Sequence, residues 1–504
     1  MFPRGSSSGA APEARPASPA RSRFPASLLV ALLVLGVSLS SGASGQTESP
    51  STAPAPATPT APGAAPALGP GVFEGAPPVT APPVMPPTPP PPTISSAPPP
   101  PFTLLETLQL PAGPLFELHP LATLAEEWTD NFDRTSRGRQ ENFRTTLAPG
   151  INLLVNGPRT RGLLGAVVSG SHDSSTDDTN VFYSFLGQAS WLASPRLTLS
   201  ASDTLTRSDE PSRADSLSLR RERRTFIGNT FGLESDWLIG TVATREFYHL
   251  STFFDDGGAD TISHNLGATA TVTILQSNSA SLGYDYLVSE TSGGTDVTGH
   301  RVTASVARQL STVASVGLAG SFARRDQSDQ PAGAPGGYDL WSLSLFNVYT
   351  IPGRWSLSGS LGYSELDPDD RSGTGGFSTQ STFTYFFVRA TASLSVDQGF
   401  SETFTGGQDF GVVQTRGVTG TLTYPFTPAI SGGTTAFWRE NTFEGTSDLP
   451  RNRTEDTWGA SASLSIRLLR WLTLGLDYRY TETTSSLRGD FSENRARASL
   501  TAAF

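Results

Sequence analysis

The stretch Trp458–Arg467 reads WGASASLSIR, and the stretch Leu472–Thr481 that follows it reads LTLGLDYRYT. In both, apolar residues alternate with polar or very small residues at every second position. Successive side chains of a β-strand point to opposite faces of the sheet, so a period of two gathers the apolar side chains on one face. The two stretches therefore predict neighbouring strands, each with one apolar and one polar face.

The same alternation extends over most of the chain from residue 115 onward. Residues 280–288, for example, place Ala, Leu, Tyr, Tyr and Val at every second position. Short connections such as residues 157–159 alternate with longer polar loops such as residues 326–337. We count ten long loops along the chain, which predicts about 20 strands.

This succession of tight turns and longer loops is typical of one fold class: an all-β, transmembrane, antiparallel up-and-down β-barrel. An outer-membrane strand needs about 9–11 residues to cross the bilayer, and residues 115–504 supply enough chain for about 20 such strands. Alternation is weaker at Arg389 and around Pro149, so 18 strands is the alternative. A closed barrel also pairs every backbone polar group that would otherwise lie unpaired in lipid.

The tryptophans fall near the ends of the predicted strands. Those by short connections are Trp191, Trp237, Trp355 and Trp471. Those towards long loops are Trp128, Trp341, Trp438 and Trp458. Two girdles of aromatic residues mark the two membrane interfaces of such barrels, so the tryptophans favour a membrane barrel over a soluble β-sandwich.

The chain ends in an alternating strand, residues 496–504, that closes on Phe504. A C-terminal aromatic residue on the apolar face resembles the terminal strand of bacterial outer-membrane barrels. The resemblance implies that Phe504 is an assembly signal read by the barrel-assembly machinery. The barrel itself would be an integral protein of the bacterial outer membrane, with lipid as its surroundings.

Two segments precede the predicted barrel, residues 115–504. Residues 1–45 read as a secretory signal peptide, because arginines precede an apolar run at 28–39 that is too short to span a membrane. Residues 46–114 carry many of the 40 prolines, and such a composition cannot build a packed core. We interpret them as a disordered, Pro/Ala-rich periplasmic linker that is either a plain spacer or a docking strip for a partner.

The composition argues against several classes of function. The formal net charge is −11, whereas a nucleic-acid-binding protein would show a basic footprint. The chain has no Cys, and its five His show no ligand spacing, so we expect no metal and no cofactor. No Gly-x-Ser-x-Gly elbow and no phosphate-binding glycine loop is present, so we expect no enzyme activity and no catalytic residues.

Charged residues on the polar faces of clear strands are candidates for lining a lumen. An Arg facing lipid at mid-membrane costs about 2–4 kcal/mol, so such side chains should point inward. The predicted pore-lining residues are Asp285, Arg301, Arg467, Asp477, Arg479, Arg495 and Arg497. They could equally form a paired network that rigidifies the wall or a set of contacts to a polar cargo.

The densest basic cluster lies beside a long loop and comprises Arg220, Arg221, Arg223 and Arg224. On the outer face these guanidinium groups could hold the phosphates of lipopolysaccharide, because Arg matches phosphate oxygens with two parallel hydrogen bonds. The alternative is a lumenal or rim cluster that Glu222 and nearby acidic residues balance.

The start of the predicted barrel carries a short motif. Its residues are Glu126, Glu127, Trp128, Thr129, Asp130 and Asn131. With the Pro-Gly step in residues 147–151 and with residues 410–413, it resembles the outer-membrane β-barrel porins found with exopolysaccharide-export and exosortase (PEP-CTERM) gene sets. Trp128 stands where that family has Tyr. The resemblance implies an aqueous conduit, without catalytic residues, that serves polysaccharide secretion together with periplasmic polysaccharide-export proteins.

Three functions therefore remain open. The first is the outer-membrane component of an exopolysaccharide export system. The second is a general or solute-specific diffusion porin, since barrels of 16–18 strands already leave an aqueous channel. The third is a non-conducting structural or adhesive barrel that acts through its loops.

Overall fold

The structure is a computed structural model that describes residues 116–211, 223–274, 277–292, 294, 296–328, 336–369, 372–402, 411–443, 453–486 and 489–504. The predicted signal peptide and Pro-rich linker lie outside these residues. Within them the chain forms one 20-stranded sheet. No helix of this described part is long and apolar enough to cross a membrane.

The first ten strands are β1 (Phe116–Thr129), β2 (Asn142–Asn156), β3 (Thr160–Asp173), β4 (Asp178–Ser194), β5 (Leu197–Ser208), β6 (Phe226–Ile239), β7 (Val242–Asp255), β8 (Thr261–Ile274), β9 (Asn278–Thr291) and β10 (Asp296–Ser311). The second ten are β11 (Ala314–Ser328), β12 (Gly337–Ile351), β13 (Trp355–Pro368), β14 (Thr374–Phe386), β15 (Thr391–Glu402), β16 (Val412–Thr427), β17 (Ile430–Phe443), β18 (Arg453–Leu469), β19 (Leu472–Ser485) and β20 (Phe491–Ala503).

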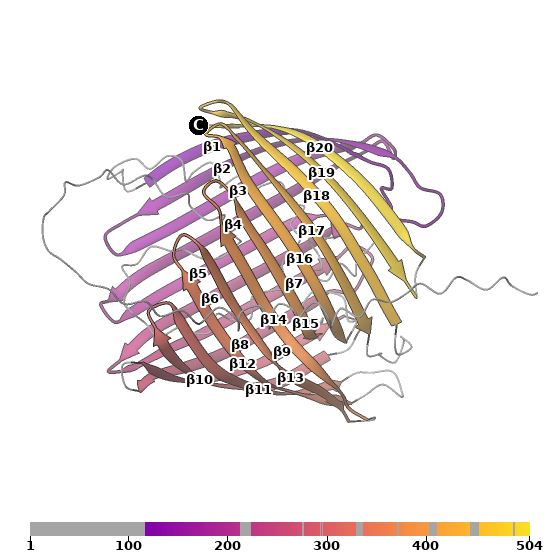
Figure 1. The fold of residues 1–504 in the computed structure, drawn as a ribbon. Helices are drawn as coiled ribbons and strands as arrows, with labels where there is room; N and C mark the ends of the chain where they lie inside the picture. The colour runs from indigo at the N-terminus through magenta and orange to yellow at the C-terminus, as the bar shows by residue number, and fades with distance from the viewer. Residues whose placement is uncertain are drawn as a thin grey trace, which may run out of the picture. The chain divides into compact units, whose positions relative to one another are not determined.

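Each strand pairs antiparallel with the next along the chain, and β1 closes the sheet by pairing with β20 from Leu121↔Ala503 to Thr129↔Arg495. Figure 1 shows the result, with indigo β1 beside yellow β20 at the seam of a barrel. The predicted all-β, antiparallel barrel of about 20 strands is confirmed, and the alternative of 18 strands is excluded.

The two weak points of the alternation have local explanations. Pro149 lies inside β2, where the register against β3 skips Ala148 and Pro149, because a Pro has no N–H to give to the ladder. Arg389 lies in the short connection between β14 and β15. Neither feature removes a hairpin.

Side chains alternate between the outside of the barrel and its lumen. Large apolar side chains occupy outward positions and are exposed there, as Leu282 (60 %) and Leu343 (50 %) show. The buried polar side chains, such as Glu455 and Thr457 on β18, lie on the opposite face. They gather at the strand ends that lead into the long loops, so packing inside the barrel is concentrated at that end.

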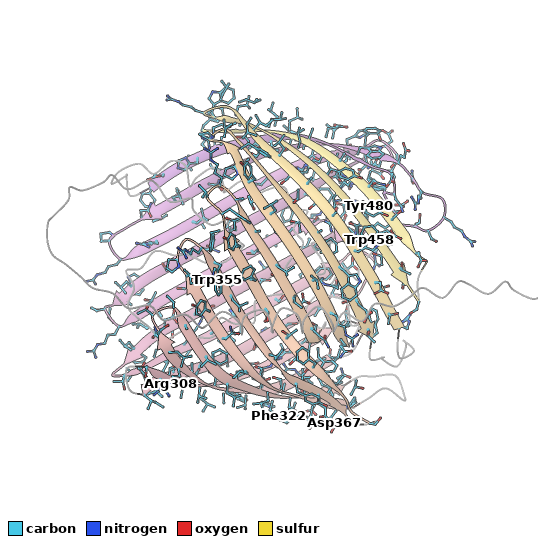
Figure 2. All side chains as sticks on the ribbon, viewed as in Figure 1. Arg308, Phe322, Trp355, Asp367, Trp458 and Tyr480 are labelled. Carbon is cyan, nitrogen blue, oxygen red and sulfur yellow. The ribbon has the colours of Figure 1, made fainter. Side chains whose placement is uncertain are left out.

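The outward aromatic residues lie towards both ends of the barrel. Figure 2 shows Trp355, beside the short turn before β13, towards one end. Trp458 and Tyr480 lie towards the other end, where their ring centroids are 5.1 Å apart. This arrangement agrees with two girdles of aromatic residues.

One hairpin departs from the regular wall. β14 and β15 pair only from Phe386↔Thr391 up to Thr379↔Gln398, whereas β15 and β16 stay paired up to Glu402↔Val412. Alternation alone would turn Glu402 and Val412 outward. Instead both contact side chains on the lumenal faces of β10 to β13. The long-loop end of the β15–β16 hairpin therefore bends away from β14 into the lumen.

Candidate functional site

Five of the predicted pore-lining residues come together on the lumenal face of β18–β20, which we call the lumenal strip. They are Arg467, Asp477, Arg479, Arg495 and Arg497. In the register, Asp477 stands opposite Arg497, and Arg479 stands opposite Arg495. Asp285 and Arg301 stand opposite each other on β9 and β10, away from this strip. That any of the seven contacts a cargo stays a prediction.

A dense ion-pair network lies at the long-loop end of the strip. Its members, which we call the Glu210 network, are Arg134, Glu210, Arg223, Glu493 and Arg495. The Glu210 carboxylate accepts hydrogen bonds from Arg134 and Arg495 at 2.9 Å and from Arg223 at 3.2 Å. Glu493 on β20 accepts from Arg134 at 3.0 Å and from Arg495 at 2.9 Å.

This network crosses the inside of the barrel. Glu210 lies two residues after the end of β5, Arg223 precedes β6, and Arg495 belongs to β20, yet β5 and β20 are not neighbouring strands. Glu210 bonds Arg495, and Arg223 contacts Glu493 at 3.5 Å, so both ends of the β5–β6 connection are tied to β20, on the other side of the β1–β20 seam. Buried ion pairs of this kind fix a geometry, because removing one partner leaves the other charge uncompensated.

A second set of contacts extends the network along β2 and β3. Arg144 bonds Asp173 at 2.7 Å and Asp209 at 2.6 Å. The guanidinium groups of Arg144 and Arg223 also lie 5.4 and 4.7 Å from the ring centroid of Phe132, in cation–π geometry. Asp209 and Glu210, adjacent in sequence, are therefore both anchored inside the lumen.

The pKa of Glu210 follows from this setting. Burial alone would raise it, but Arg495, Arg223 and Arg134 outweigh the burial and hold the pKa well below its usual 4.5. A group whose folded-state pKa is depressed contributes stability above its unfolded pKa and loses that contribution as pH falls through the folded value.

We therefore expect the Glu210 network to stay closed at neutral pH and at pH 5, and to weaken only well below pH 4.5. Heat-modifiability on gels, measured from pH 7 down to pH 2.5, checks this. If heat-modifiability were lost with a midpoint between pH 7 and pH 5, the result would contradict this expectation.

A second network centres on Glu402 at the end of β15. Its carboxylate accepts hydrogen bonds from Arg325 at 2.9 Å, from Arg301 at 3.0 Å and from the Tyr338 hydroxyl at 2.6 Å. Arg325 is only 2 % exposed. We call these four residues the Glu402 network.

An apolar cluster lies beside the Glu402 network. Val297, Tyr338, Leu366 and Val412 pack together and are buried, and Leu340 and Phe400 contact them. Val412 and Phe400 belong to the bent hairpin, and the other residues belong to β10, β12 and β13. Apolar packing and a buried carboxylate thus hold the hairpin end against the lumenal wall.

The structure describes two members of the basic cluster, whereas Arg220 and Arg221 lie outside the described residues. Arg223 has 3 % of its side chain exposed and bonds Glu210, so it is not placed on the outer face to hold lipopolysaccharide. Arg224 contacts Asp255 at 3.2 Å and the Gly257 carbonyl at 2.9 Å. Both arginines fit the alternative of a lumenal or rim cluster, with Glu210 and Asp255 as partners.

The motif residues at the end of β1 hold the barrel seam. Thr129 donates to Glu493 at 3.2 Å, Asp130 accepts from the Asn494 side chain at 2.7 Å, and Asn131 donates to the Ser492 carbonyl at 2.9 Å. All three bonds join the end of β1 to β20.

The other three motif residues divide between the two faces. Glu126 lies on the outer side and accepts from Thr145 at 2.7 Å, whereas Glu127 reaches Arg495 at 3.7 Å. Trp128 pairs with Ala496 of β20 and lies on the Glu126 side of the alternation. The motif residues therefore have a structural role, which is to join β1 to β20 at the seam.

Phe504 lies at the same seam. Its backbone N–H donates to the Pro120 carbonyl at 3.0 Å, and its ring stacks on Trp471 with centroids 5.6 Å apart. We expect deletion of Phe504 to reduce the amount of folded barrel in the outer membrane, because the last ladder bond and an interfacial ring pair are lost. Membrane fractionation checks this, and Phe387→Ala, which removes another exposed ring at a short turn, is the control. Normal levels without Phe504 would contradict the expectation.

Sequence reasoning missed the residues at the centres of both networks. Glu210 lies in a connection, where alternation gives no information, and Glu402 lies on a strand face that alternation assigns to the outside. Arg144 and Arg325 were detectable in principle, since both follow the lumenal period near a strand end. Among the described residues no group of three or more His, Asp or Glu could hold a metal ion.

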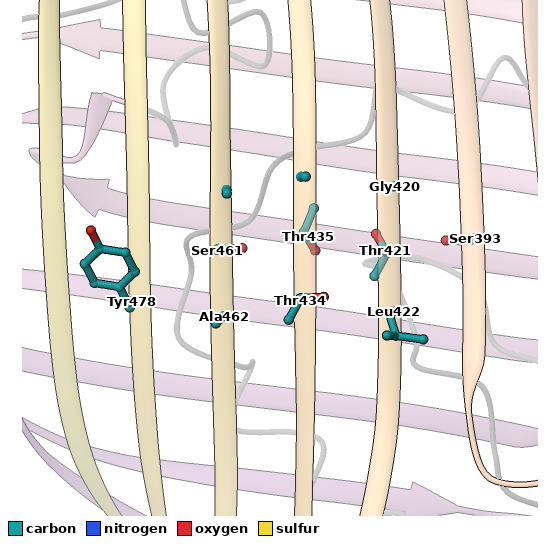
Figure 3. A pocket seen from close by; sticks show the side chains of 11 residues that line it. Ser393, Gly420, Thr421, Leu422, Thr434, Thr435, Ser461, Ala462 and Tyr478 are labelled. Carbon is teal, nitrogen blue, oxygen red and sulfur yellow. The ribbon is translucent and has the colours of Figure 1, made fainter.

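A shallow hollow of about 500 Å³ lies over β16–β19. Figure 3 shows it on the wall, between Leu422 and Tyr478. The outward positions between these two side chains are small: Gly420, Thr434, Ala436, Ala460 and Ala462. The hollow is therefore a dip in the apolar outer surface and does not belong to the charged lumenal networks.

Comparisons with known proteins give matches only among solved structures. No family model and no curated protein matches the chain. The ferric enterobactin receptor PfeA of Pseudomonas aeruginosa shares 10 % identity over 77 % of this chain and 80 % of its own, with a TM-score of 0.44. The siderophore receptor PirA of the same organism has 10 % identity, the same coverage and a TM-score of 0.45.

The solved structure of OccK3 (OpdO) of Pseudomonas aeruginosa also matches. It shares 14 % identity over 77 % of this chain and 96 % of its own, with a TM-score of 0.39. Similarity at this level carries no conclusion about what this chain does.

Proposed function

We propose that the chain is a β-barrel of the bacterial outer membrane that forms an aqueous conduit for a polar cargo. The observation that carries this proposal is the division between the two faces of a closed barrel. Large apolar side chains are exposed on the outside, and most of the side chains that face the inside are charged or carry hydroxyl groups. An apolar outer band with aromatic girdles and a polar interior is the arrangement of a membrane-spanning barrel.

We further propose that the cargo is an exopolysaccharide and that periplasmic polysaccharide-export proteins deliver it. This finer assignment is supported by the resemblance of the motif at Glu126–Asn131 and by a lumen of mixed charge that suits a hydrated polymer. A solute-specific diffusion porin uses the same wall chemistry and stays the nearest alternative.

One observation favours a barrel that does not conduct at rest. The Glu210 and Glu402 networks both lie at the long-loop end and place paired side chains inside the barrel at different parts of the wall. A structural or adhesive barrel would keep them closed permanently, whereas an exporter would open them while cargo passes.

The deciding experiment is a clean deletion strain in which surface and periplasmic polysaccharide are measured, with envelope integrity as the control. We expect surface polymer to be lost while the envelope stays intact. Unchanged polymer, under conditions in which it is made, would overturn the export assignment. Single-channel recording of the purified barrel then separates a diffusion porin, which conducts constitutively, from a closed barrel.

A further inference from the structure

Arg479 is a lumenal arginine that forms no ion pair with any described residue. Its Nε donates to the Thr481 hydroxyl on the same strand at 3.2 Å, and its Nη1 is buried without a hydrogen-bond partner. Among the described residues no carboxylate lies within ion-pair distance of its guanidinium. Buried polar groups in native structures are nearly always bonded, so an unsatisfied guanidinium N–H calls for an explanation.

Arg495, which stands opposite Arg479, does have acidic partners. Arg495 is surrounded by Glu210 and Glu493 at 2.9 Å and by Glu127 at 3.7 Å. Glu493 and Glu210 are also held by Arg134 and Arg223, and neither they nor Glu127 form an ion pair with Arg479. The like charges of Arg479 and Arg495 stand directly opposite each other, an unfavourable arrangement that a bound anion would relieve.

The surroundings of Arg479 suit a sugar. Ser461 stands opposite it on β18, and Thr481 follows two positions along β19 on the same face. Nearer the short turns, Ser463 flanks Asp477 and Ser499 faces Gly475. The wall beside Arg479 therefore offers hydroxyl groups, which can exchange hydrogen bonds with sugar hydroxyls.

Arg479 also lies where a cargo would pass. Along the lumenal strip from the short-turn end come Arg467, then the Asp477–Arg497 pair, then Arg479 and Arg495, and last the Glu210 network. A polymer that enters from the short-turn end would therefore meet Arg479 immediately before the Glu210 network.

We propose that Arg479 anchors a lumenal binding site for the carboxylate groups of an acidic oligosaccharide. The proposal rests on the proposed function and narrows its cargo to a polymer that bears carboxylates. The planar guanidinium matches a carboxylate with two parallel hydrogen bonds, and the Ser and Thr hydroxyls beside it contact the sugar ring.

The test is isothermal titration calorimetry on the full-length barrel folded in detergent, which needs no conduction. The probes are tetragalacturonate, neutral maltotetraose and inorganic phosphate. We expect tetragalacturonate to bind the wild type, and Arg479→Gln to weaken that binding about tenfold or more, as expected for loss of a charge-assisted pair. Arg479→Lys keeps the charge but lacks the planar guanidinium. Its affinity for tetragalacturonate should therefore lie between those of the wild type and Arg479→Gln.

The matched control is Arg245→Gln, the same change at a lumenal arginine on β7 that Glu234 already pairs. It should leave the affinity within about twofold of the wild type. Heat-modifiability confirms that each variant is a folded barrel. If Arg479→Gln does not fold, the comparison is made between the wild type and Arg479→Lys.

Three results would overturn the proposal: equal binding by wild type and Arg479→Gln, equal binding of maltotetraose, or phosphate that competes as well as tetragalacturonate does, which would mark a site for small anions only. Its failure is separable from that of the conduit. A barrel that conducts without binding tetragalacturonate loses this site alone. A barrel that binds it while surface polymer is unchanged in the deletion strain keeps the site and loses the export role.

Discussion

A Glu210→Gln variant is expected to insert as a barrel, to unfold at a lower temperature and to conduct more than the wild type. Within its network, Glu210 is the carboxylate that belongs to the β5–β6 connection. It bonds Arg134, Arg223 and Arg495. An amide removes one of the two carboxylate charges of the network, so Glu493 alone remains beside three guanidinium groups. Breaking a buried ion pair completely costs about 3–5 kcal/mol, and the partial compensation by Glu493 should keep the cost at or below that range.

The barrel wall should survive this change, since the strand ladders do not depend on Glu210. The loss should fall on the described ends of the β5–β6 connection, residues 209–211 and 223–225, because their tie to β20 is weakened. Heat-modifiability on gels gives the stability, and single-channel recording gives the conductance.

Glu234→Gln is the matched control, because Glu234 is a lumenal glutamate on β6 with a half-exposed partner, Arg245. A partly exposed ion pair contributes about 1 kcal/mol or less, so this variant should unfold and conduct nearly as the wild type does. If Glu210→Gln matched the control in both measurements, the Glu210 network would not be what ties these two ends to β20.

Glu402→Gln is expected to have the second largest effect. Among the described residues of the bent β15–β16 hairpin, Glu402 is the one that pairs with Arg325 and Arg301. Its loss leaves Arg325 buried without a carboxylate, at a cost of about 3–5 kcal/mol. The Tyr338 hydroxyl keeps an acceptor in the amide oxygen, and the apolar cluster around Val412 is unchanged, so the hairpin should loosen and the barrel should stay folded.

The two arginines of this network provide the comparison. Arg325 is 2 % exposed, whereas the Arg301 side chain is 34 % exposed. Replacing Arg325 with Gln should therefore lower the unfolding temperature markedly, and replacing Arg301 should lower it little, because solvent screens the exposed pair. Hydrogen exchange of residues 399–402 and 411–414 reports the hairpin directly. Equal protection in the wild type and in Glu402→Gln would show that packing alone holds the bend.

The sequence by itself determined the fold class, the number of strands and the inward or outward direction of most side chains. Alternation is a local property: Trp458 and Leu476 lie outside, and Glu455 and Asp477 lie inside, because a strand has a period of two wherever it is placed. The aromatic residues at the strand ends and the short and long connections follow the same local rule. For this reason the five residues of the lumenal strip could be found without a structure.

Only the tertiary structure decided how the lumen is filled. Glu210 meets Arg495 across strands that lie far apart in the sheet, and no spacing in the sequence encodes that distance. Glu402 and Val412 lie inside although their alternation points outward, because the β15–β16 hairpin leaves β14 and turns its outer face against the lumenal wall. Alternation fixes which face of a strand a side chain takes, but where that face points depends on how the whole sheet bends and closes.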